Sequence, residues 1–83
     1  MKAEIRKLLG TEKLVIGTER VMQELRAGAL QQVVVASNCD ERVLEDINHY
    51  AGDTAVVQLD VPNEELGVYC KKPFHVQTLG IRA

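Results

Sequence analysis

Along the chain, stretches with the helical spacing of apolar residues alternate with stretches that have the pattern of strands. Four segments carry apolar residues three or four positions apart, as on one face of an amphipathic helix. Between them lie short apolar runs rich in β-branched residues, which are typical of strands. The predicted helices lie within 1–9, 18–27, 40–51 and 62–70, and the predicted strands within 14–16, 33–36, 55–59 and 74–81.

Residues that start and stop helices stand at several of these boundaries. Gly10 and Gly52 follow the first and third predicted helices, and glycine readily adopts the left-handed conformation at a helix end. Thr18 is expected to cap the second helix, and Pro62 with Asn63 to open the fourth. The boundaries therefore support the division that the apolar pattern gives.

The central part of the chain has the clearest pattern. The run Val33–Ala36 is apolar without alternation, which indicates a strand covered on both faces. The helix that follows, Asp40–Ala51, has an apolar face and an acidic face. The apolar face holds Val43, Leu44, Ile47, Tyr50 and Ala51, and the opposite face holds Glu41, Arg42, Glu45 and Asp46.

Strands that alternate with helices predict an α/β domain with helices on both faces of one sheet. The length of 83 residues leaves room for one domain, which we expect to span residues 1–83. In such sheets, binding sites lie in the loops at one end of the strands. The pattern does not give the strand order.

Composition agrees with a packed core. Apolar residues make up 46% of the chain, and 24 of them are Leu, Ile or Val, so a disordered tail is not expected. No apolar run approaches the roughly 20 residues of a membrane-spanning helix, and no signal peptide is visible. The two cysteines, Cys39 and Cys70, do not make a disulfide framework. We therefore expect a cytoplasmic protein with reduced thiols.

Charge is distributed unevenly behind a net value of −2. Residues 1–30 hold six basic and four acidic groups, and residues 66–83 hold three basic groups and no acid. Residues 31–65 hold one basic and eight acidic groups. If the fold brings the two basic segments together, one end of the molecule could attract phosphate.

Three loops carry candidate chemistry. At Gly17–Arg20 a glycine follows a strand and precedes a helix, so free amides could receive an anion, or the segment could simply be a capped turn. Asn38 after the central strand could cap the next helix or read a base or ribose. Lys71 and Lys72 precede a Pro-fixed turn and Phe74, a composition used in RNA contact, although Phe74 could instead lie in the core.

Metal binding and catalysis have little support. Cys39, His49, Cys70 and His75 include the residue types of a zinc site, but only the last two have a ligand-like spacing. Nothing in the sequence marks a Cys–His pair as a nucleophile. We expect no metal site, no catalytic residue and no cofactor.

The order of motifs is similar to that of a known family. The matching stretches are KLVIGTERVMQELRAG, QQVVVASNCDERVLEDINHYA and VPNEELGVYCKKPFHVQTLGI. Over nearly its whole length the chain resembles the kink-turn RNA-binding ribosomal protein superfamily, particularly its archaeal and eukaryotic L-thirty-e branch. The resemblance implies a three-layer α-β-α sandwich with a mixed sheet of about four strands. It also implies binding to a sharply bent internal loop of RNA, without catalysis or cofactor.

The resemblance also assigns RNA contacts to the three loops. Gly17 matches the glycine that allows close approach, Asn38 the asparagine after the second strand, and Phe74 an aromatic that contacts RNA in some members. With these, the expected RNA face contains Gly17, Thr18, Glu19, Arg20, Gln23, Asn38, Lys71, Lys72 and Phe74.

Three positions in this set depart from the family pattern. Where the family usually has Asn or Lys and then Glu or Gln, this chain has Glu19 and Arg20, and where it usually has Lys one turn later this chain has Gln23. A carboxylate beside phosphates repels them, and a missing Lys weakens binding and its salt dependence.

The leading hypothesis is a non-catalytic ribosomal-type protein that binds ribosomal RNA or another kink-turn RNA, with ribosomal or other ribonucleoprotein partners. Its rival is a family member that has lost the RNA site and binds a basic protein partner through the acidic helix Asp40–Ala51. A small enzyme built on the two thiols and two histidines is a third hypothesis.

Overall fold

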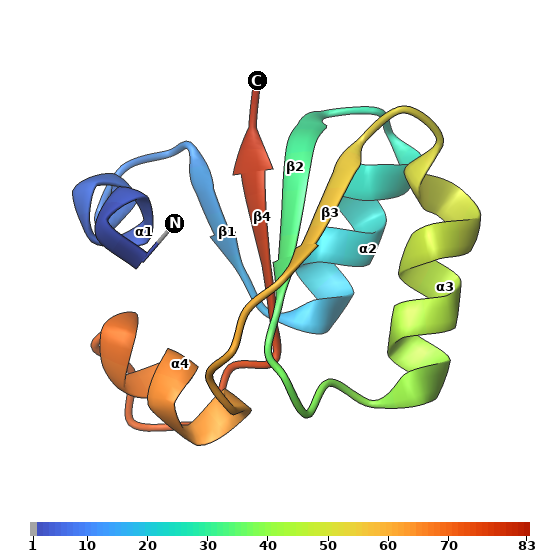
Figure 1. Ribbon diagram of the computed structural model, residues 1–83. Helices are drawn as coiled ribbons and strands as arrows, with labels where there is room; N and C mark the ends of the chain where they lie inside the picture. The colour runs from blue at the N-terminus through green and yellow to red at the C-terminus, as the bar shows by residue number, and fades with distance from the viewer. Residues whose placement is uncertain (1) are drawn as a thin grey trace.

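The computed structural model describes residues 2–83, which form four helices and four strands in alternating order (Figure 1). The elements are α1 (Lys2–Leu8), β1 (Leu14–Ile16), α2 (Thr18–Arg26), β2 (Leu30–Val35), α3 (Glu41–Ala51), β3 (Ala55–Gln58), α4 (Asn63–Tyr69) and β4 (Thr78–Arg82). The predicted succession is confirmed for every element. Met1, included in the first predicted helix, lies outside the described residues.

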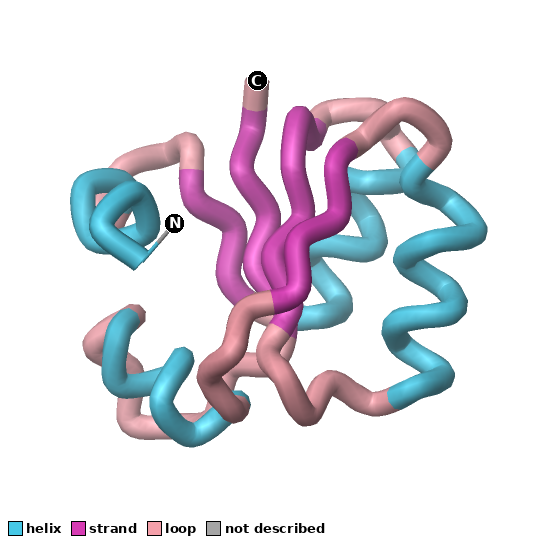
Figure 2. Tube along the Cα trace, in the orientation of Figure 1, coloured by secondary structure: helices cyan, strands magenta, loops and turns pink. Residues whose placement is uncertain are grey.

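The strands form one mixed sheet in the order β1-β4-β2-β3 (Figure 2). β4 pairs antiparallel with β1 on one side and with β2 on the other, whereas β2 and β3 are parallel. β2 and β4 therefore occupy the centre, which explains the apolar run Val33–Val35 within β2. β2 begins three residues before the predicted stretch 33–36, since Leu30 and Gln32 pair with Arg82 and Ile81 of β4. β1, only three residues long, and β3 are the edge strands.

Helices cover both faces of the sheet, α1 and α4 on one and α2 and α3 on the other (Figure 1). Successive residues of a strand point to opposite faces, so β2 supplies two cores. Val33 and Val35 pack in the cluster that contains Ile47 of α3, and Val34 packs in the cluster that contains Leu66 of α4. The expected three-layer α-β-α sandwich is confirmed.

The last strand begins later than the pattern predicts. It was expected over 74–81 but spans Thr78–Arg82. Pro73 has no amide N–H to give to a sheet, and the amide of Val76 donates to the carbonyl of Asn63 instead of to a strand. Residues 71–77 are therefore a loop that crosses the start of α4.

One residue assigned to the core from the sequence is exposed. Tyr50 of α3 was placed on the apolar helix face, but 45% of its surface is exposed. Its ring stacks edge to face with His49, and the guanidinium of Arg26 lies 5.1 Å from its centroid. Ala51, the next residue and the last of α3, is buried, so Tyr50 lies at the margin of the apolar face and not in the core. No helix among residues 2–83 is long and apolar enough to cross a membrane.

The carboxyl ends of β1, β2 and β3 and the start of β4 lie at one edge of the sheet, where α2, α3 and α4 begin (Figure 1). The three loops singled out from the sequence all belong to this edge.

Candidate nucleic-acid interface

Hydrogen bonds fix the three loops to one another at this edge. The amide of Gly17 in the β1–α2 junction donates to the carbonyl of Thr78, 3.2 Å away. The amide of Ala36 at the end of β2 donates to the carbonyl of Gln77, 2.9 Å away. The amide of Ser37 donates to Val61, which precedes α4, at 2.8 Å. Loops separated by up to 61 residues therefore form one surface.

Gly17 holds a backbone conformation that other residues avoid, with φ 109° and ψ 142°. A Cβ atom built on it would meet no atom within 4 Å. The glycine is therefore required by its backbone angles, while the space above it is open to a ligand. This geometry suits the close approach that the resemblance implies, at the N-terminus of α2, where amides favour anions.

Thr18 does not cap α2 as predicted, because it is the first helical residue and makes no capping hydrogen bond. Its hydroxyl donates to the hydroxyl of the buried Thr78 at 3.3 Å and accepts from the amide of Gln77 at 3.4 Å. The other end of that amide accepts a hydrogen bond from the backbone N–H of Asp40. Gln77 thus joins the β1–α2 junction to the start of α3.

The role of Gln77 and Thr78 was not predicted from the sequence. Both residues are ordinary polar positions in the middle of the predicted strand 74–81, and nothing local distinguishes them. Their importance comes from the strand order, which places the start of β4 between the ends of β1 and β2.

Asn38 is bonded across to α4 rather than to the helix that follows it. Its side-chain oxygen accepts from the backbone N–H of Asn63 at 2.8 Å, and its amide nitrogen donates to the Asn63 side chain at 3.2 Å. Asp40 caps α3, accepting from the N–H of Arg42 at 2.8 Å. The alternative that Asn38 caps α3 is therefore wrong, because the cap is Asp40, the residue directly before the helix. Asn38 is exposed and retains a free N–H.

The loop after α4 presents Lys71, Lys72 and Phe74 to solvent. The helix ends in a Schellman motif, in which the amide of Lys71 donates to Val68 and that of Lys72 donates to Gly67, each at 3.0 Å. Lys71 occupies the left-handed position of this motif, with φ 55°. Phe74 is 55% exposed, so the alternative that it lies in the core is excluded.

The close packing of this loop depends on Gly67. A Cβ atom at this position would lie closer than 3.0 Å to the carbonyl oxygen of Phe74 and 3.3 Å from its carbonyl carbon. The absence of a side chain on α4 thus allows the Phe74 backbone to lie against the helix.

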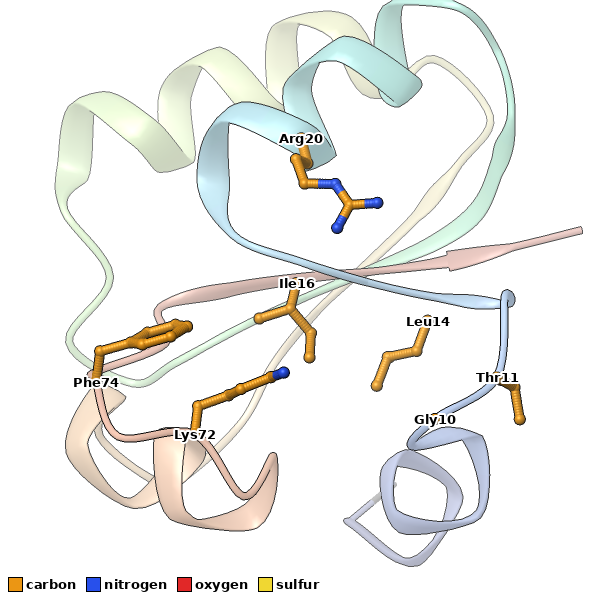
Figure 3. A pocket seen from close by; sticks show the side chains of 7 residues that line it. All are labelled: Gly10, Thr11, Leu14, Ile16, Arg20, Lys72 and Phe74. Carbon is orange, nitrogen blue, oxygen red and sulfur yellow. The ribbon is translucent and has the colours of Figure 1, made fainter.

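A groove of about 390 Å³ adjoins this loop and contains three of the predicted site residues (Figure 3). Arg20 extends into it from α2, and Lys72 and Phe74 extend into it from the α4–β4 loop. Glu19 and Gln23, also on α2, are exposed but do not line it.

The two basic segments of the sequence come together only in part. Arg20 and Lys72 line the same groove. A separate pocket of about 250 Å³ is lined by Lys7, Lys13 and Arg82. The condition set by the charge pattern, that the fold brings the basic segments together at one end, is thus met for Arg20 and Lys72 only. β1 and β4 are antiparallel, so Lys13 before β1 and Arg82 at the end of β4 both lie at the opposite end of the sheet.

The thiols are buried, and burial raises the pKa of both Cys39 and Cys70. They belong to the clusters on opposite faces of the sheet. Neither is therefore an activated nucleophile. Among residues 2–83, no group of three or more His, Cys, Asp or Glu side chains could hold a metal ion.

Solved structures share this fold. The chain superposes on a protein of unknown function from Bacillus halodurans with a TM-score of 0.76 at 16% identity, covering 99% of this chain and 80% of that one. It superposes on the Giardia lamblia 15.5kD RNA binding protein with a TM-score of 0.72 at 14% identity, covering 99% and 68% of the two chains.

Sequence relatives are closer. Large ribosomal subunit protein eL30 of Archaeoglobus fulgidus is 39% identical over 77 residues, 93% of this chain and 87% of that protein. The protein of the same name from Sulfurisphaera tokodaii is 32% identical over 82 residues, 96% and 77% of the two chains. Both are ribosomal proteins and not enzymes, which agrees with the expectation of a non-catalytic chain.

The sequence model of the ribosomal protein L7Ae/L30e/S12e/Gadd45 family matches residues 1–83. The resemblance drawn from the three motif stretches is confirmed. The chain belongs to the ribosomal protein L7Ae/L30e/S12e/Gadd45 family.

Proposed function

We propose that this protein is a ribosomal-type, non-catalytic RNA-binding protein that recognises a bent, kink-turn internal loop of RNA. The observation that carries the proposal is the joining of three loops into one hydrogen-bonded edge that exposes cations and an aromatic ring. The names of its relatives support it, since they include large-subunit ribosomal proteins and an RNA binding protein.

Each part of the edge has a distinct role in this proposal. The amides at the start of α2, beside the open space over Gly17, receive the phosphate backbone where it bends. Arg20, Lys71 and Lys72 contact flanking phosphates. The exposed ring of Phe74 stacks on an unpaired base.

The four remaining predicted contact residues are Thr18, Glu19, Gln23 and Asn38. Thr18 acts mainly by holding the loops together, because its hydroxyl is bonded to Thr78 and Gln77. Glu19 and Gln23 are exposed one turn apart on α2, close to Arg20. Each lowers the affinity for RNA relative to a basic residue at the same position. Asn38 offers its remaining N–H to a base or ribose.

The proposal also implies the partners of the protein and its place in the cell. A protein of this kind binds ribosomal RNA or another kink-turn RNA and has ribosomal or other ribonucleoprotein partners. Such assemblies place it in the cytoplasm.

The test is the affinity for a kink-turn RNA and for a straight duplex of the same length, each titrated at two salt concentrations. We expect preference for the bent RNA and weaker binding at high salt. Phe74→Ala should weaken binding by about 5- to 150-fold through loss of one stacking contact. Val68→Ala is the matched control, because Val68 is exposed on α4 and does not line the groove.

Circular dichroism should show both variants folded. Equal weak binding to bent and straight RNA would refute the proposal. It would leave the acidic outer face of α3 as the functional surface, with Glu41, Glu45 and Asp46 exposed to a basic protein partner.

A further inference from the structure

Asn38 and Asn63 form a hydrogen-bonded pair between the β2–α3 loop and the start of α4. The backbone N–H of Asn63 donates to Oδ1 of Asn38 at 2.8 Å, and Nδ2 of Asn38 donates to Oδ1 of Asn63 at 3.2 Å. The two residues lie 25 positions apart in the sequence. The expected RNA contacts include Asn38 but not Asn63, so the second member of the pair has no assigned role.

The backbone of Asn63 decides which way round the Asn38 amide lies. A backbone N–H can only donate, so the Asn38 atom that faces it must be the oxygen. The Asn63 side-chain oxygen then holds one of the two N–H groups of Asn38. A flipped amide would place N–H against N–H and oxygen against oxygen, and both bonds would be lost. Asn38 thus has one fixed amide orientation although its side chain is exposed.

Backbone hydrogen bonds hold both members of the pair in place. Asn63 is the first residue of α4, which has no side-chain cap of its own, so Asn38 satisfies this helix N–H from another loop. The carbonyl of Asn63 accepts from the N–H of Val76 at 3.1 Å. The N–H of Ser37, next to Asn38, donates to the carbonyl of Val61 at 2.8 Å. The Asn63 side-chain oxygen is therefore kept beside Asn38 by the fold.

The bonds within the pair decide what Asn38 has left to offer. A primary amide has two N–H donors and one oxygen, and here the oxygen and one N–H are bonded to Asn63. A side chain held in this way cannot make the two-point contact, one donor and one acceptor, by which a free asparagine reads adenine. It can donate its second N–H to one acceptor, such as a base nitrogen, a base carbonyl, a ribose oxygen or a phosphate.

We propose that Asn63 is a positioning residue for RNA recognition, whose side-chain oxygen sets Asn38 to donate a single N–H to an acceptor on the RNA. This inference rests on the proposed function. It gives Asn63 a role that acts through Asn38, without a contact between Asn63 and the RNA. The alternative is a purely structural Asn63 that only holds the start of α4.

A double-mutant cycle on the affinity for kink-turn RNA separates the two roles. Asn63→Ala removes the side-chain oxygen and keeps the backbone N–H, and it should weaken binding by about 2- to 12-fold, the worth of one hydrogen bond. Asn38→Ala should weaken binding by a similar factor, and the double variant should bind like Asn38→Ala. A purely structural Asn63 would instead give factors that multiply. Asn48→Ala, which changes an exposed asparagine of α3, is the control and should leave the affinity unchanged.

Two aspartate variants test the donor directly. Each adds one negative charge to the same pair, and titration in 1 M salt, where the Debye length is about 3 Å, screens that charge. Asn63→Asp keeps an oxygen facing Nδ2 of Asn38, and the nitrogen that it removes makes no hydrogen bond within residues 2–83. It should therefore bind like the wild type. Asn38→Asp keeps an oxygen for the Asn63 N–H but has no donor, so it should lose as much affinity as Asn38→Ala.

The outcomes separate this inference from the proposed function. Failure of the wild type to prefer bent RNA over a straight duplex overturns both. A retained preference with multiplying effects of Asn63→Ala and Asn38→Ala overturns the positioning role alone. Wild-type affinity in Asn38→Ala or Asn38→Asp overturns the donor role. Circular dichroism checks the fold of each variant, and the two aspartate variants decide the question if Asn63→Ala does not fold.

Discussion

Replacing Gly67 with alanine tests how the α4–β4 loop is positioned. The new Cβ would lie closer than 3.0 Å to the carbonyl oxygen of Phe74, 3.3 Å from its carbonyl carbon and 3.4 Å from the Cα of His75. All three are backbone atoms, so no side chain can rotate away. The loop that carries Phe74 must therefore move away from α4.

Two opposing effects set the change in stability. Overpacking of this kind costs about 1–3 kcal/mol. Alanine within a helix recovers roughly 0.5–1 kcal/mol relative to glycine. The net loss in the free energy of unfolding should therefore be about 0–2.5 kcal/mol, small enough to leave a folded protein. Displacement of the Phe74 backbone should also remove its stacking contact, weakening the affinity for kink-turn RNA by about 5- to 150-fold.

Urea denaturation and RNA titration measure the two effects on the same sample. Val68→Ala is the neighbouring control: Val68 is 71% exposed on the same helix, so both quantities should stay close to those of the wild type. Gly67→Ala with unchanged stability and unchanged RNA affinity would refute the packing argument. A loss of stability without a loss of affinity would show that the position of Phe74 does not matter for binding.

Three further changes test other parts of the edge and its support. Glu19→Lys should tighten RNA binding, because it adds one phosphate contact, and it should steepen the slope of log affinity against log salt by about one unit. An unchanged slope would place residue 19 away from the RNA. Lys71→Gly should raise stability by about 1 kcal/mol in urea denaturation by relieving the left-handed conformation at φ 55°, and should weaken RNA binding at low salt; a less stable variant would contradict the strain argument. Arg82 donates to both carboxylate oxygens of Glu24, and these hydrogen bonds lower the pKa of Glu24. The ion pair therefore stabilises the fold at pH values above the pKa of an unfolded glutamate. This stabilisation is lost as the pH falls through the lower pKa of Glu24 in the folded protein. Glu24→Gln should accordingly melt below the wild type at pH 7, by a margin that shrinks as the pH falls below the pKa of an unfolded glutamate, whereas a pH-independent difference would argue against the ion pair.

The order and type of elements could be predicted because each depends on local pattern. β2 shows this most clearly, since the part of a central strand that helices cover on both faces, here Val33–Val35, needs apolar residues at successive positions. The later start of β4 could not be predicted, because Val76 and Phe74 are as apolar as strand residues. Only the tertiary bond from Val76 to Asn63 shows that this stretch belongs to a loop.

The candidate site was predictable where backbone chemistry is visible in the sequence. Gly17 stands at a strand–helix junction, and its angles confirm that only glycine suits the position. Gln77 was missed because its role arises from contacts with Thr18 and Asp40, which lie 59 and 37 residues away. Asn38 was assigned to the wrong helix for the same reason, since its partner Asn63 is distant in sequence.

The most direct test of the account is to follow backbone amide resonances by NMR while kink-turn RNA is added. The account predicts the largest shifts at Gly17–Arg20, Asn38 and Lys71–Phe74, with α3 from Glu45 onward nearly unchanged. Shifts concentrated on the exposed face of α3, or spread evenly over the molecule, would contradict it.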